Sequence, residues 1–208
     1  MAVWDWLQRI IGSENALSKS MAPSQPIVQS AKARTGRDDI IAYAVKLSGL
    51  VLHQPDAMAF YHTTFADYID SQARYDDFRK QGDLLDKDAL KAHGLRSNVK
   101  VSAQFLATLN DRGCSDPLEA AGVIGLTISA ALCSWRDLEG FKSKGISEVK
   151  LLAADRQPGP CASAAAIQDR KQPTTRASIL PFETCDRLGR CACTYLGWLP
   201  IMDELGIE

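Results

Sequence analysis

Hydrophobic residues recur at steps of three and four positions along most of the first 145 residues, the spacing that gives a helix one apolar face. The pattern predicts a short amphipathic helix over residues 1–11. Residues 18–36 are rich in Ser, Pro, Ala and Gln and are typical of a linker. The body that follows is predicted to contain helices over residues 35–48, 55–82, 86–94, 99–112 and 116–145.

The helix predicted over residues 55–82 carries a stripe of mostly aromatic side chains. Its members are Met58, Tyr61, Phe65, Tyr68, Gln72 and Tyr75. Such a stripe is either an aromatic stacking platform for a ligand or the face that a helix turns toward the core. The second interpretation is favoured, because large apolar faces of amphipathic helices are normally buried.

Residues 116–119 (Asp-Pro-Leu-Glu) are the clearest helix start in the chain. Aspartate is a preferred N-cap residue, and proline fits the first helical position because its missing N–H is not needed there. The residues that follow are apolar nearly all round, which predicts a central buried helix. The longest uncharged apolar stretch, residues 120–134, is shorter than the roughly 20 residues that span a bilayer, so we expect no transmembrane segment.

The pattern changes after Gly145 from helical spacing to alternation. Residues 147–153 and 194–199 are predicted to be strands. Pro158-Gly159-Pro160 ends the strand pattern between them.

The composition of the 208 residues is that of an ordinary globular protein, with 46% hydrophobic and 24% charged residues and a net charge of −1. This balance argues against nucleic-acid binding driven by charge, which requires clustered cations. A local basic concentration near the cysteines nevertheless keeps that alternative open: Arg170, Lys171, Arg176, Arg187 and Arg190.

The apolar run at the start contains Asp5 and Arg9 and has no basic segment before it, so we expect no secretory signal. The predicted location is therefore the cytoplasm. A reducing compartment favours metal binding over disulfides where cysteines cluster.

Four of the six cysteines lie in the last quarter of the chain: Cys161, Cys185, Cys191 and Cys193. Thiolates are the preferred donors of structural zinc, which takes four tetrahedral ligands. Cys191 and Cys193 are two residues apart, so on a strand their side chains would leave the same face. Leu188-Gly189 supplies a turn that could bring Cys185 alongside them. The sequence therefore predicts a zinc site with these four ligands, while disulfides and unliganded thiols stay open as alternatives.

The other two cysteines carry no such pattern. Cys133 lies in the apolar helix and is predicted to be a small buried hydrophobe. Cys114 lies at a turn beside Gly113 and has no recognisable partner. No phosphate loop, GxSxG elbow or HExxH motif is present, so no catalytic residues are predicted.

The order of these features resembles the C-terminal segment of phage head-morphogenesis (minor head) proteins. A strand ending near Ala154-Asp155 is followed by Pro160-Cys161, Leu180-Pro181, Cys185 and Cys191-Ala192-Cys193. In that family a CxxC pair precedes a proline-rich stretch and a closing Cys-Arg-Cys. Here Ala164 stands in place of the second cysteine of the pair and Ala192 in place of the arginine. The resemblance implies a phage, prophage or bacterial origin, and a virion-associated location if the chain is phage-derived.

The predicted fold is mainly α, with a helical body and a small β-containing, zinc-ribbon-like C-terminal module. The expected domain boundaries are an N-terminal helix and linker (1–36), the helical body (37–145) and the cysteine-rich module (146–208). The predicted function is that of a non-enzymatic structural or protein-interaction protein with a protein partner. The alternatives are a nucleic-acid-binding regulator and an enzyme whose site has no readable motif.

Overall fold

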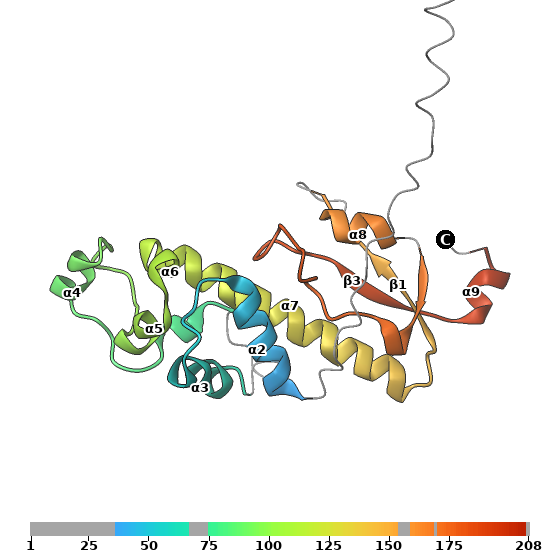
Figure 1. Cartoon of the computed structure of the whole chain (residues 1–208), viewed down its shortest axis with the longest axis horizontal. Helices are drawn as coiled ribbons and strands as arrows, with labels where there is room; N and C mark the ends of the chain where they lie inside the picture. Colours follow the sequence, from blue (N-terminus) through green and yellow to red (C-terminus); the bar gives the residue numbers. More distant parts are fainter. Residues whose placement is uncertain (1–35, 67–74, 154–158, 169, 207–208) are drawn as a thin grey trace, which may run out of the picture.

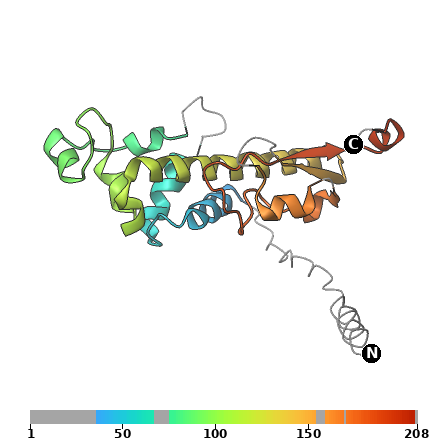
Figure 2. The same cartoon turned by 90° about the horizontal axis from the view of Figure 1, so that it is seen from above.

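One long helix, α7 (Pro117–Ser143), runs along the molecule, with α2 beside its middle, short helices toward its start and the strands toward its end (Figures 1 and 2). The computed structural model describes residues 36–66, 75–153, 159–168 and 170–206. The helix predicted over residues 1–11 and the linker up to residue 35 lie outside the described residues. The elements before α7 are α2 (Arg37–Ser48), α3 (Pro55–Thr64), the 3₁₀ helix η2 (Asp77–Lys80), α4 (Lys87–Ala92), α5 (Ala103–Thr108) and α6 (Asp111–Ser115). Those after it are β1 (Glu148–Leu152), α8 (Ala162–Ile167), β2 (Lys171–Pro173), η3 (Thr174–Arg176), β3 (Thr194–Trp198) and α9 (Pro200–Glu204).

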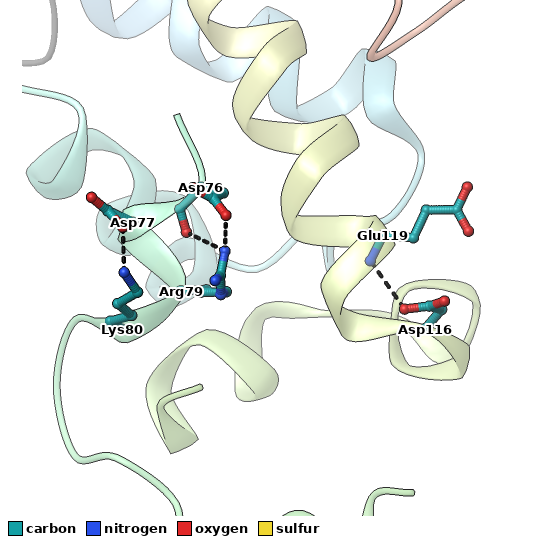
Figure 3. Close-up of polar contacts among 6 residues, drawn as sticks. All are labelled: Asp76, Asp77, Arg79, Lys80, Asp116 and Glu119. Carbon is teal, nitrogen blue, oxygen red and sulfur yellow. Dashed lines mark hydrogen bonds and ion pairs between the residues drawn. The ribbon is translucent and has the colours of Figure 1, made fainter. Parts of the chain in front are cut away.

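The start of α7 follows the predicted capping chemistry. Asp116 is the N-cap, and its carboxylate accepts a hydrogen bond from the Glu119 backbone N–H at 3.0 Å (Figure 3). Pro117 occupies the first helical position, where no N–H is required. This end of the helix is therefore determined by local sequence, as expected.

Helix α3 is shorter than predicted. It begins at Pro55 as expected but ends at Thr64, well before Gly82. The β-branched Thr63 and Thr64 are poor helix formers, and the following Phe65 packs against Phe78 of η2 with ring centroids 5.3 Å apart.

The aromatic stripe is a core feature where the structure describes it. Tyr61 and Phe65 are fully buried. Tyr61 also contacts the Phe78 ring, and its hydroxyl lies 2.9 Å from Thr108 Oγ1. Tyr68 and Gln72 lie outside the described residues.

The single helix predicted over residues 99–112 is also wrong, because two caps divide it. Ser102 Oγ accepts from the Phe105 N–H and starts α5, and Asn110 Oδ1 accepts from the Gly113 N–H and starts α6. Between the two helices Leu109 is extended and bridges Val51. Side-chain acceptors that favour helix starts thus interrupt an otherwise helical pattern.

The chain after α7 builds a three-stranded antiparallel sheet in the order β2-β1-β3. In register, Val149 pairs with Gly197 and Leu151 with Tyr195. Val149 and Leu151 are buried as their alternation predicts. The two predicted strands are thus present, and β2, α8 and α9 are additions that the sequence pattern does not show.

Two hydrophobic clusters share α7. The larger one joins α2, α3, η2 and α5 to the N-terminal part of α7, through residues such as Ile40, Ile124 and Leu132. The smaller one joins Leu138 of α7 to the sheet and to Cys161 and Cys185. The fold is therefore mainly α with a small sheet.

The segment Ser178–Phe182 ties the two clusters together. The Leu180 N–H donates to Ser134 Oγ of α7 at 3.0 Å, and the Tyr43 hydroxyl of α2 donates to the Pro181 carbonyl at 2.5 Å. Partly buried Ile179 packs against both clusters. Cys185 follows this segment directly, so its position depends on the helical body.

By length and composition α7 is the one helix within the described ranges that could cross a membrane. Half of its apolar window is buried inside the protein. Since its faces pack against α2 and the sheet, the protein's own core accounts for this apolar character.

The two glycines Gly122 and Gly125 of α7 give a matched test of this packing. A Cβ at Gly125 would lie 2.0 Å from the Tyr75 carbonyl oxygen, whereas a Cβ at Gly122 would meet no atom within 4 Å. We expect Gly125→Ala to lower the free energy of unfolding by about 1–3 kcal/mol through overpacking. Gly122→Ala should raise it by up to about 1 kcal/mol, since alanine is the better helix former. Urea denaturation of both variants checks this, and equal effects would contradict it.

Candidate metal centre

The four predicted zinc ligands come from separate elements. Cys161 is the N-cap residue of α8, and Cys185 follows the Ser178–Phe182 segment. Cys191 and Cys193 lie just before β3, which begins at Thr194. The prediction that Cys191 and Cys193 sit on a strand is therefore wrong, because the ladder with β1 starts only at the Thr194–Leu152 pair. Both still pack against the smaller hydrophobic cluster.

The four thiols interact in the order Cys161–Cys185–Cys191–Cys193. The Cys185 side chain interacts with those of both Cys161 and Cys191, and Cys191 interacts in turn with Cys193. None of the four is joined to another by a disulfide. The fold thus brings together cysteines up to 32 positions apart in the sequence.

This row of four thiols makes successive pairwise contacts and does not form a coordination site. Within the described segments, no three or more His, Cys, Asp or Glu side chains converge in a way that could hold a metal ion. A tetrahedral site would require rotation of side chains or a small movement of the Asp186–Arg190 loop.

Burial and crowding raise the pKa values of three of these thiols, Cys161, Cys185 and Cys191. Cys161 and Cys185 are only 3% and 6% exposed. Burial is the largest cause that raises the pKa of Cys161. For Cys185 the interaction with Cys191 is the largest cause, followed by burial, and the pKa lies well above its usual range. The Cys185 thiol lowers the pKa of Cys191, but Cys193 and burial outweigh it and the net shift is upward.

Two local features hold the row together. The hydroxyls of Ser163 and Thr184 lie 2.5 Å apart and join the segment after Cys161 to the segment before Cys185. The predicted turn is present at Gly189, whose φ of 73° is in the left-handed region that favours glycine. The Ser163–Thr184 contact has no signal in the sequence, because its partners are far apart along the chain.

Ala164 has a packing role at the position where a second cysteine of a CxxC pair would stand. It is fully buried in the smaller cluster. Its backbone hydrogen bond to Cys161 lowers the pKa of that thiol, against the larger effect of burial.

The remaining cysteines stay apart from this row. Cys114 is exposed in α6, and its thiol lies 3.8 Å from the Leu109 carbonyl. Cys133 is half-buried rather than fully buried as predicted, because it lies on the side of α7 that the two clusters leave partly open.

The basic residues near the cysteines do not form an uninterrupted cationic surface. Lys171 pairs with Asp203 and lies 5.0 Å from the centroid of the Trp198 ring, and Arg187 lies 3.7 Å from Asp186. The Lys171 ammonium lowers the pKa of Asp203. These pairs use part of the positive charge that nucleic-acid binding would require.

Comparison with protein-family models, with curated proteins and with solved structures finds no match to this chain. The resemblance of the last quarter to phage head-morphogenesis proteins therefore stays a prediction from its residues.

The raised thiol pKa values predict how the metal-free protein responds to pH. A group whose pKa is higher in the folded state contributes stability below the unfolded pKa, about 8.5 for cysteine, and loses it as pH rises toward the folded pKa. We therefore expect the free energy of unfolding, measured with urea and a chelator present, to fall between pH 7.5 and 9.5. Cys185→Ser should flatten this decline, since it removes the most strongly shifted thiol.

Cys114→Ser is the control, because it removes an exposed thiol outside the row. An identical pH dependence in wild type and Cys185→Ser would show that the cluster does not couple to folding.

Proposed function

We propose that the chain is a non-enzymatic structural or protein-interaction protein whose C-terminal module is stabilised by one zinc ion. The ligands are Cys161, Cys185, Cys191 and Cys193, and the module is zinc-ribbon-like. The observation that carries this proposal is the row of four interacting thiols, assembled from two distant parts of the chain.

The chemistry of the row favours a cation. Four adjacent sulfurs in a largely buried place cannot ionise together, since each thiolate would repel the next and lose hydration. A divalent cation removes that obstacle because it neutralises the thiolates as the protons leave. Thiolate is also the softest donor in proteins and selects zinc over magnesium or calcium.

The surroundings favour a structural role over a catalytic one. Four protein ligands fill a tetrahedral zinc site and leave no position for water or substrate. The module has a small core of its own, built around Val149, Leu151 and Leu180, so cross-linking its loops adds directly to its stability. A rigid module fixed to a helical body suits the presentation of a docking surface.

The partner is proposed to be a protein, and the phage, prophage or bacterial origin rests on the resemblance of the last quarter of the chain. The nucleic-acid alternative is less favoured because Asp186 and Asp203 pair with two of the basic residues. Recovery of nucleic acid with the purified protein, with an affinity that falls steeply with salt, would favour that alternative.

Elemental analysis tests the metal. Protein purified without added metal should contain about one zinc per chain, because four thiolates make one closed site. Replacing Cys161, Cys185, Cys191 or Cys193 by serine should lower the zinc content, whereas Cys114→Ser and Cys133→Ser should leave it unchanged. A metal-free protein with the same stability before and after chelator treatment would contradict the proposal.

Hydrogen exchange locates the effect of metal removal. We expect chelation to raise amide exchange in residues 159–198 far more than in α2 and α3, since structural zinc contributes on the order of 10–16 kcal/mol to folding of small zinc modules. Uniform exchange changes along the whole chain would instead indicate that the zinc does not act on this module.

A further inference from the structure

The loop between Cys185 and Cys191 forms one wall of an open groove of about 770 Å³. The other wall is the N-terminal part of α7 together with α6, and it includes Arg112, Glu119 and Val123. Cys185 itself lines the groove although only 6% of its surface is exposed. The groove therefore reaches the residue at one end of the loop, while Cys191 at the other end lies outside its lining.

The loop folds back so that its two ends meet. The Arg190 N–H donates to the Arg187 carbonyl at 2.9 Å, which closes a tight turn around Gly189. A Cβ on Gly189 would lie 3.0 Å from the Val123 Cα, so the turn rests directly on α7. The side chains of Cys185 and Cys191 interact across the base of this loop.

We propose that Cys185 and Cys191 are a redox-active pair, which a peroxide converts to a disulfide across the base of the groove loop. Cys191 is half-buried and more open than Cys185, so its sulfur meets the oxidant first. Cys185 is the resolving thiol.

Each step balances. Cys191 first loses its proton to solvent, and the resulting thiolate attacks one peroxide oxygen. The O–O bond breaks, and the departing oxygen takes up a proton and leaves as water. The resulting sulfenic acid is attacked by the Cys185 sulfur. The S–S bond forms as the S–O bond breaks, and the Cys185 proton leaves with a second water. Two thiols are oxidised and hydrogen peroxide is reduced to two waters.

The other pairs of cysteines in the row are less suitable for a disulfide. Cys191 and Cys193 are separated by one residue, and a disulfide between them would close a strained ring. Cys161 is 3% exposed at the start of α8, so an oxidant reaches it less readily than half-buried Cys191. Within the row of four, the disulfide leaves only Cys161 and Cys193 as thiols, too few for a closed zinc site. Release of the metal on oxidation rests on the proposed function, whereas the pairing itself does not.

Peptide mapping of the full-length protein tests the pair. Trypsin cleaves after Arg187 and Arg190, so Cys185 and Cys191 fall on separate peptides that only a disulfide can join. After one equivalent of hydrogen peroxide we expect this linked pair, the loss of two of the six free thiols, and reversal by dithiothreitol. Fragmentation of the linked peptide distinguishes Cys191 from Cys193. Cys191→Ser should abolish the link, and exposed Cys114 is the internal control for unselective oxidation.

The redox pair and the zinc site are tested by different outcomes of this experiment. Oxidation of Cys114 before the pair, or a link through Cys161 or Cys193, would overturn the redox pair. A Cys185–Cys191 link in a protein that never contained zinc would uphold the pair and overturn the proposed metal site. If zinc is present, a chromogenic chelator should detect one zinc per chain as the disulfide forms. Zinc that stays bound would overturn metal release.

Discussion

The whole structure depends on burial of α7. Its N-terminal part completes a core with α2, α3 and α5, and Leu138 near its other end begins a second core with the sheet. Half of its apolar window is buried in the protein, because exposed apolar area is costly in water. Both clusters therefore form around one long helix, and the Cys185–Cys191 loop contacts it at Gly189.

The connection between the two cores consists of polar contacts as well as packing. Ser134 accepts the Leu180 N–H and Tyr43 donates to the Pro181 carbonyl, so an irregular segment satisfies its buried backbone groups on two helices. That segment leads directly to Cys185. The place of Cys185 therefore depends on the helical body, and the loop that follows it rests on α7 at Gly189.

Elements with a local physical signal are predictable from this chain. Asp116 and Pro117 indicate the start of α7, and Asp86 caps α4 by accepting from the Ala89 N–H. The alternation at Val149 and Leu151 indicates β1. The end of α3 and the break between α5 and α6 are not predictable from periodicity, because apolar spacing continues across them while Thr64 and Asn110 stop the helices. The clustering of four cysteines in sequence is likewise visible, but their contacts depend on long-range packing.

By itself the sequence determined the mainly helical body, the start of the central helix, the two strands that carry alternating residues, and the set of cysteines able to act together. These follow from hydrogen bonds and side-chain spacing within a few residues. Only the tertiary structure decided that β1 lies between β2 and β3, that Cys161 meets Cys185, and that the Cys185–Cys191 loop walls a groove against α7. Such contacts join residues far apart in the chain, and their stability comes from the burial of shared surface rather than from any local pattern.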